Sequence, residues 1–203
     1  MEHKRLTLFA GHYGSGKTNI AVNYALHLAS EGKKVCIADL DIVNPYFRTK
    51  DSAKVLEEAG IHLVSPQFAN SNVDLPALPA EAYRLVTDRK TYGIMDIGGD
   101  DRGAYALGRY VPGILEENNY RMIFVANASR PLTRTPEDAM EVMGEIEAAC
   151  GLHFTDLVNN TNLGSLTTAE TVLKSRDYME KLSKLSGLPI FMTTAKADVA
   201  AQL

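Results

Sequence analysis

The sequence predicts an α/β fold, in which a doubly wound and mainly parallel sheet is flanked by helices. Short apolar runs alternate along the chain with longer segments whose apolar residues repeat with helical spacing. The first of these runs is followed directly by a glycine-rich stretch that opens a helix. With 203 residues, 45% apolar and 23% charged, the chain has the composition of a globular protein. We therefore expect one domain over residues 1–203.

The first half of the chain begins with Leu6–Ala10, an apolar run that predicts a buried strand and stops at Gly11. A helix is predicted over Lys17–Ser30, where apolar residues repeat with helical spacing until Gly32 ends the pattern. The same criteria predict the strand Val35–Ala38, the helix Thr49–Ala59, the strand Ile61–Val64, a long loop over residues 65–79, the helix Ala80–Arg89 and the strand Tyr92–Asp96.

In the second half, Arg121–Ala126 predicts another buried strand. Thr135 is typical of a helix N-cap, because Pro136 follows it and the acids Glu137 and Asp138 come next. A helix is therefore expected from there to Cys150. The remaining predicted elements are the strand Phe154–Val158, the helix Thr168–Ser186 and the strand Pro189–Met192.

Charge and composition exclude several classes of function. Lys+Arg 21 against Asp+Glu 25 gives a net charge of −4, so no nucleic-acid partner and no anionic membrane surface is predicted. No apolar run approaches the ~18 residues of a membrane-spanning helix. Cys36 and Cys150 are the only thiols, which favours a reduced, cytoplasmic protein. The five histidines are scattered without ligand-like spacing, so we expect no dedicated zinc site.

The strongest motif is Gly11-His12-Tyr13-Gly14-Ser15-Gly16-Lys17-Thr18, a complete G-x-x-x-x-G-K-[ST] between a predicted strand and a predicted helix. Its glycines allow successive backbone N–H groups to point at phosphate oxygens, and the helix adds its positive dipole end. Lys17 would neutralise β- and γ-phosphate charge, and the Thr18 hydroxyl would ligate Mg²⁺. An ordinary glycine-rich turn is the alternative reading. The candidate nucleotide-binding residues here are Gly11, Gly14, Ser15, Gly16, Lys17, Thr18 and Asn19.

Two acidic sites follow predicted strands, at the edge where α/β sheets bind their ligands. The first is Asp39-Leu40-Asp41, and the second is Asp96-Ile97-Gly98-Gly99. Asp96 lies where a carboxylate can hold Mg²⁺ through a water opposite a phosphate-binding loop. Gly99 and its neighbour Gly98 permit close approach of the backbone to a γ-phosphate. Capping of the next helix or turn is the alternative role for these acids.

Together these three motifs resemble the MinD/ParA/Mrp/CobQ superfamily, which belongs to the SIMIBI class of P-loop NTPases, over about residues 4–195. The resemblance implies catalytic roles for Lys17 and for Asp41, which lies 24 positions later where the family carries the aspartate that orients the attacking water. It also implies that Asp39 and Asp96 join Thr18 near Mg²⁺. The segment Asn44–Arg48 then corresponds to the first switch.

One position departs from the pattern of the MinD and ParA ATPases. They carry a second, signature lysine after the first glycine of the motif, which reaches the phosphates of the partner in a dimer. This chain has His12 there, and a neutral imidazole does not supply the same fixed charge. The departure weakens the expectation of a MinD-type homodimer, although a second copy of the chain stays a candidate partner.

The base of the nucleotide is predicted from the residues that follow the strand Phe154–Val158. GTP-binding members carry N/T-K-x-D there, whereas this chain has Asn159-Asn160-Thr161-Asn162 without lysine or aspartate. In adenine-binding relatives an asparagine at this strand end pairs with the base, and Asn160 is the best match. An amide can both donate to and accept from adenine, so ATP is favoured over GTP. A turn-forming asparagine is the alternative.

The leading functional hypothesis is a Mg²⁺-dependent ATPase that uses hydrolysis as a conformational switch toward an unidentified partner. The first alternative is an ATP-dependent ligase or phosphoryl-transfer enzyme of the CobQ/dethiobiotin-synthetase type, whose members also lack the signature lysine. In that case the 65–79 loop would line a substrate site. The second alternative is a nucleotide sensor that does not hydrolyse ATP.

Overall fold

The computed structural model describes residues 3–41, 52–64, 80–99 and 101–203 of the chain. At its centre lies one seven-stranded sheet with the strand order β3-β2-β4-β1-β5-β6-β7, and every pair of neighbouring strands is parallel. The predicted α/β class is therefore confirmed, with a sheet that is parallel throughout. The strands are β1 Leu6–Ala10, β2 Val35–Leu40, β3 His62–Val64, β4 Tyr92–Ile97, β5 Tyr120–Ala126, β6 Asp156–Asn159 and β7 Ile190–Thr193.

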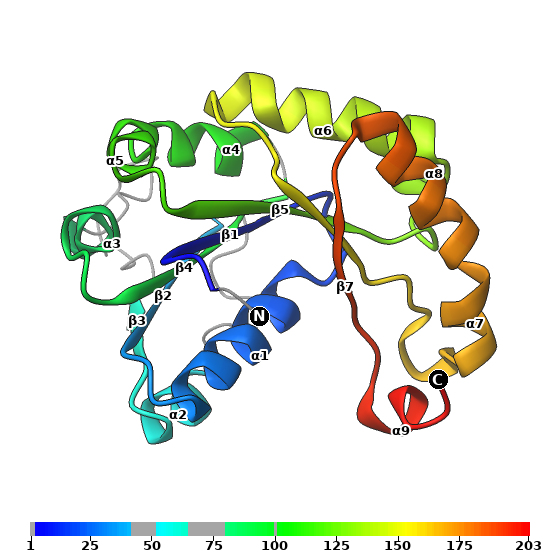
Figure 1. The fold of residues 1–203 in the computed structure, drawn as a ribbon, viewed down its shortest axis with the longest axis horizontal. Helices are drawn as coiled ribbons and strands as arrows, with labels where there is room; N and C mark the ends of the chain where they lie inside the picture. Colours follow the sequence, from blue (N-terminus) through cyan, green and yellow to red (C-terminus); the bar gives the residue numbers. More distant parts are fainter. Residues whose placement is uncertain (1–2, 42–51, 65–79, 100) are drawn as a thin grey trace, which may run out of the picture.

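Helices cover both faces of this sheet (Figure 1). Alternate side chains of a strand point to opposite faces, so Leu8 of β1 packs in the layer under α4, α6 and α8, whereas Phe9 packs in the layer under α1. Parallel strands need crossover connections, and the helices supply them. The α-helices are α1 Lys17–Ser30, α2 Ala53–Glu58, α3 Arg84–Thr87, α4 Asp101–Gly108, α5 Val111–Glu117, α6 Pro136–Cys150, α7 Ala169–Lys174, α8 Arg176–Ser186 and α9 Ala197–Ala200.

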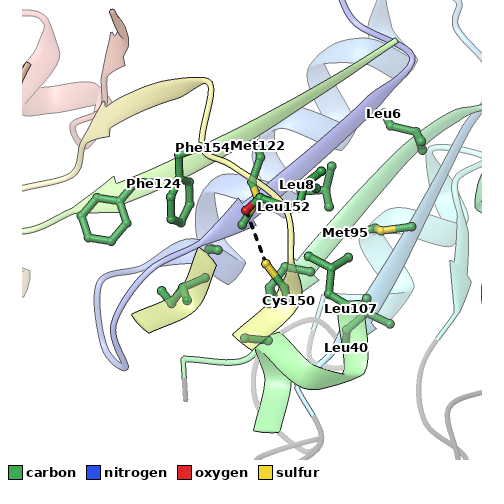
Figure 2. Close-up of a cluster of buried hydrophobic side chains, with 14 of the residues drawn as sticks. Leu6, Leu8, Leu40, Met95, Leu107, Met122, Phe124, Cys150, Leu152 and Phe154 are labelled. Carbon is green, nitrogen blue, oxygen red and sulfur yellow. Dashed lines mark hydrogen bonds between the residues drawn. The ribbon is translucent and has the colours of Figure 1, made fainter. Parts of the chain in front are cut away.

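Figure 2 shows part of the layer that lies between the sheet on one side and α4 and α6 on the other. The rings of Phe124 and Phe154 pack edge to face there, with 5.3 Å between their centroids. The Cys150 thiol ends α6 in this layer and donates to the carbonyl of Leu152 at 3.5 Å. Burial raises the pKa of this thiol and, to about 11, the pKa of the Cys36 thiol. Both cysteines are buried and unpaired, so neither contributes a disulfide.

Two helices that the sequence analysis did not predict, α4 and α5, follow β4. The helical spacing of apolar residues in these two segments is interrupted by poor helix formers, which are Gly103 in α4 and Pro112 and Gly113 in α5. Burial compensates for these poor helix formers, because the side chains of Leu107 and Ile114 are fully buried in the core.

Other differences concern element boundaries. The strand predicted to end at Ala38 continues to Leu40, so Asp39 lies within β2. The helix predicted over Thr168–Ser186 is divided at Ser175 into α7 and α8. The Ser175 hydroxyl is used there as a buried hydrogen-bonding group, since it donates to the Val172 carbonyl and accepts from Asn159.

Some expectations fall outside the described residues: the first switch at Asn44–Arg48, the start of the helix predicted from Thr49 and the loop over residues 65–79. Within the described ranges, the structure contains no helix that combines the length and the apolar character needed to span a bilayer.

Candidate functional site

The loop between β1 and α1 leaves the start of α1 open to an anion. Gly14 and Gly16 have φ angles of +76° and +94°, which side-chain-bearing residues rarely adopt, so the turn depends on glycine. Gly16 is the N-cap of α1, no side chain caps the helix and its first turn contains no acid. By contrast, α6 is closed by its own capping box between Thr135 and Asp138. The first turn of α1 therefore directs its N–H groups and the positive end of its dipole at a site suited to phosphate.

Two side chains at the start of α1 point back into this loop. Lys17 is only 7% exposed, and its Nζ donates to the carbonyl of His12 at 3.3 Å. The Thr18 hydroxyl donates to Oδ2 of Asp96 at 2.6 Å, although the two residues are 78 positions apart. The first interaction joins the end of the glycine-rich motif to its second residue, and the second connects α1 with the end of β4.

The other residues of the motif have different surroundings. Gly11 packs against β5, because a Cβ on it would lie 2.8 Å from the carbonyl oxygen of Val125. The buried Ser15 hydroxyl has no hydrogen-bond partner among the described residues. The His12 ring donates through Nδ1 to the carbonyl of Tyr13 at 3.0 Å. Asn19 is exposed on the first turn of α1, and its carbonyl accepts from the side chain of Asn23.

Two buried carboxylates lie side by side at this edge of the sheet. Asp39 and Asp96 are register partners in β2 and β4, and each residue is 2% exposed. Burial first, and then the charge of Asp96, raises the pKa of Asp39 to about 8. The backbone N–H of Asp41 donates to Oδ1 of Asp39 at 3.0 Å, which opposes this shift.

The donor set fits a hard divalent cation. The Thr18 hydroxyl and two carboxylates are oxygen ligands of the kind that Mg²⁺ prefers. A cation between Asp39 and Asp96 would offset both the burial of the Asp39 carboxylate and its repulsion by Asp96, the two causes that raise the pKa of Asp39. Thr18, Asp39 and Asp96 are thus the residues that could hold Mg²⁺ here.

The segment after β4 approaches the loop closely, as the two glycines suggest. A Cβ on Gly99 would lie 2.7 Å from the backbone nitrogen of Tyr13 and 3.1 Å from Nζ of Lys17. A Cβ on Gly98 would lie 3.4 Å from Oδ1 of Asp41. The backbone after β4 therefore contacts both the lysine of the motif and the acid after β2.

Asn160 connects the end of β6 to the same loop. Its Nδ2 donates to the carbonyl of Ser15 at 2.6 Å, and its Oδ1 accepts from the Thr194 hydroxyl at 2.7 Å. An amide has two hydrogens and two lone pairs, so each end retains capacity for a ligand. The neighbouring Asn159 is 2% exposed and donates to Ser175, which makes it a structural residue.

One further cation lies against the loop. The guanidinium carbon of Arg130 is 3.4 Å from the position that a Cβ on Gly14 would take. Its side chain is exposed, and within the described ranges no carboxylate forms an ion pair with it. The buried Asn127 fixes this turn, since it accepts from the backbone N–H groups of Ser129 and Arg130. An arginine in a loop gave no specific signal in the sequence, because only the fold brings it to Gly14.

Comparison with known proteins supports the fold. No protein-family model and no curated protein matches the chain. Among solved structures, it is similar to the signal recognition particle receptor FtsY from Elizabethkingia anophelis, with 20% identity and a TM-score of 0.60 over 98% of this chain and 62% of that chain. The 54 kDa signal recognition particle protein from Aeropyrum pernix, in complex with GDP, gives 18% identity and a TM-score of 0.58 over 96% of this chain and 42% of that chain.

A nucleotide-binding protein from Archaeoglobus fulgidus in complex with ADP gives 13% identity and a TM-score of 0.54, and covers 97% of this chain and 85% of that chain. These likenesses confirm the expected α/β fold, a parallel sheet flanked by helices. The chain spans about three fifths of the length of the FtsY structures it matches.

The buried acid pair gives a prediction about stability and pH. The pKa of Asp39 is about 8 in the folded chain and near the ordinary 3.8 when unfolded, so between these pH values the folded state holds one more proton. In the absence of metal, the contribution of Asp39 to the free energy of unfolding therefore falls as pH rises from about 4 to about 8. Asp39→Asn should be more stable than the native chain by more than about 1 kcal/mol at pH 8.

Denaturant unfolding of both chains in EDTA at pH 5 and pH 8 measures this difference. It should shrink at pH 5, and Asp177→Asn, which changes an exposed aspartate of α8, serves as the control. A difference between Asp39→Asn and the native chain that does not change with pH would contradict the account.

Proposed function

We propose that the chain is a Mg²⁺-dependent ATPase that uses hydrolysis as a conformational switch toward a partner. The observation that carries the proposal is the uncapped start of α1, which follows glycines of positive φ and contains a buried lysine and a threonine bonded to Asp96. Backbone N–H groups, a fixed cation and oxygen ligands at one place are the chemistry that a nucleoside triphosphate with its metal requires.

Each residue has a distinct role in this proposal. Lys17 binds the β- and γ-phosphates, and Thr18, Asp39 and Asp96 hold Mg²⁺, which neutralises phosphate charge when bound. Asp41 orients the attacking water by accepting a hydrogen bond from it. The remaining nucleotide contacts are assigned to Gly11, Gly14, Ser15, Gly16, Asn19, Gly99 and Asn160.

The contacts of Gly98 and Gly99 suggest how the state of the nucleotide reaches the surface. Gly99 lies against Lys17 and Gly98 against Asp41, so loss of the γ-phosphate changes the surroundings of both glycines. Gly103, in α4, packs so closely on Gly98 that a Cβ on it would lie 2.5 Å from the Gly98 Cα. Movement after β4 would therefore be transmitted to α4, which is the output that the switch requires.

Arg130 compensates in this proposal for the missing signature lysine. It approaches the loop at Gly14 from within the same chain, whereas His12 directs its Nδ1 to a backbone carbonyl. A guanidinium is always charged and binds phosphate in a bidentate manner. A second copy of the chain is then not required for charge neutralisation, although it stays a candidate partner.

A small-molecule substrate is the second candidate for the switch's target. A cavity of about 350 Å³ adjoins Arg130 and is lined by Ala128, Ser129, Pro131, Arg134 and Leu163. Arg134 in its lining could bind an acidic group, so the cavity favours the alternative of phosphoryl transfer to, or ligation of, a small acidic metabolite. Turnover that appears only when a metabolite is added would support this alternative over the switch.

The catalytic role of Asp41 is tested by Asp41→Ala. Since the loop, Lys17 and the metal ligands remain, we expect ATP affinity to stay within about threefold while hydrolysis slows by about 100-fold or more. Phosphate release under saturating Mg²⁺ and ATP measures the rate. Asp177→Ala, which removes an exposed aspartate from α8, is the control. An unchanged rate in Asp41→Ala would assign water activation to another residue.

The choice of adenine depends on Asn160. Because ATP presents a base edge and inorganic triphosphate does not, Asn160→Ala should weaken the binding of ATP by about 1–2 kcal/mol and that of triphosphate by less. The native chain should bind ATP more tightly than GTP, since no lysine–aspartate pair follows β6 to meet guanine. Competition binding with the three ligands measures both effects. Equal affinities for ATP and GTP would remove Asn160 from the base site.

A further inference from the structure

At the end of α1 that is remote from the phosphate-binding loop, His3 meets His27 and Glu31, which lie one helical turn apart. Nε2 of His3 lies 3.1 Å from Oε2 of Glu31, and Nε2 of His27 lies 3.4 Å from Oε1 of the same carboxylate. One ligand atom from each of the three residues lies within 4.8 Å of the others. We call this group the His–His–Glu cluster.

Two of these separations, which join the two imidazoles to different oxygens of Glu31, are compatible with ligands of one transition-metal ion. Zinc binds imidazole nitrogen and carboxylate oxygen at about 2.0–2.1 Å, and two such ligands at the tetrahedral angle lie roughly 3.3 Å apart. The two N···O distances, 3.1 and 3.4 Å, bracket this value. The nitrogens and the carboxylate could therefore become ligands of one ion after small side-chain movements.

The surroundings also favour a cation. Glu31 is the C-cap of α1, where the carbonyl ends of the helix concentrate partial negative charge. The second ring nitrogen of His3, Nδ1, is 3.0 Å from the hydroxyl of Tyr24, whose residue is 7% exposed. Such an outer contact fixes the orientation of a metal-bound imidazole. The His3 side chain is 11% exposed, whereas that of His27 is 57% exposed and leaves a route for entry.

We propose that the His–His–Glu cluster binds a divalent transition-metal ion such as Zn²⁺ or Co²⁺. Two imidazoles and one carboxylate select these ions over Mg²⁺ and Ca²⁺, which prefer oxygen ligands. The site is distinct from the Mg²⁺ residues, because the 14 residues of α1 separate the two ends of the helix by about 21 Å.

The ion would join the segment before β1 to the end of α1. His3 precedes β1, whereas the other two ligands belong to the last turn and C-cap of α1. With three protein ligands, a fourth position stays open to water or another ligand. The expected consequence is stabilisation of the folded chain by the metal, with nucleotide binding unaffected.

The test is zinc titration of the untagged, EDTA-treated chain by calorimetry, with the melting temperature as a second readout. We expect one Zn²⁺ per chain and a higher melting temperature with zinc. His27→Ala and Glu31→Gln should each weaken zinc binding by about tenfold or more. Co²⁺ should give visible absorption bands that the same variants lose.

His153→Ala is the matched control, because His153 also contacts a glutamate, Glu147, at 3.0 Å, but within the described ranges no third ligand joins this pair. It should bind Zn²⁺ as the native chain does. Both test variants alter largely exposed side chains, so their folding, checked by circular dichroism, should be retained. If the native chain binds no zinc, or if His27→Ala and Glu31→Gln bind zinc as tightly as the native chain does, the proposal is overturned and only an ion-pair cluster remains.

Discussion

The candidate site depends on one geometric constraint, the parallel direction of all seven strands. Because every strand ends at the same edge, the loop after β1, the acids of β2 and β4 and the asparagine after β6 converge although they are far apart in the sequence. The hydrogen bond from Thr18 to Asp96 and that from Asn160 to Ser15 are direct results of this arrangement. Reversal of one central strand would move that strand's groups to the opposite edge of the sheet and leave the site incomplete.

This edge of the sheet concentrates charge where burial is costly. A lysine and two aspartates are nearly inaccessible there, and the Asp39 carboxyl stays protonated to about pH 8 without a cation. These buried charged groups lower the stability of the chain without ligands, and ligands of opposite charge would compensate for their burial. The dipole of α1 favours opposite charges at its two ends. Its start, which is partially positive, suits an anion, and its end, which is partially negative, lies at the His–His–Glu cluster.

The sequence predicted the class of fold and most strands, because buried parallel strands are short apolar runs and the glycine-rich loop occupies a fixed place between strand and helix. It did not predict α4 and α5, since burial of Leu107 and Ile114 outweighs the glycines that break their pattern. Spacing identified Asp39, Asp41 and Asp96 as residues of one edge. It could not reveal that Arg130 lies against Gly14, or that His3 reaches His27 and Glu31, because only tertiary structure creates those contacts.

The loop between β1 and α1 is proposed to bind the phosphates of a nucleoside triphosphate through Lys17. Calorimetric titration of Mg·ATP into the native chain and into folded Lys17→Ala tests it most directly, with Lys181→Ala, an exposed lysine on α8, as the control. We expect saturable binding of Mg·ATP to the native chain and to the control, and an affinity lower by about tenfold or more in Lys17→Ala. Equal affinity of the native chain and Lys17→Ala for Mg·ATP would exclude this role of Lys17.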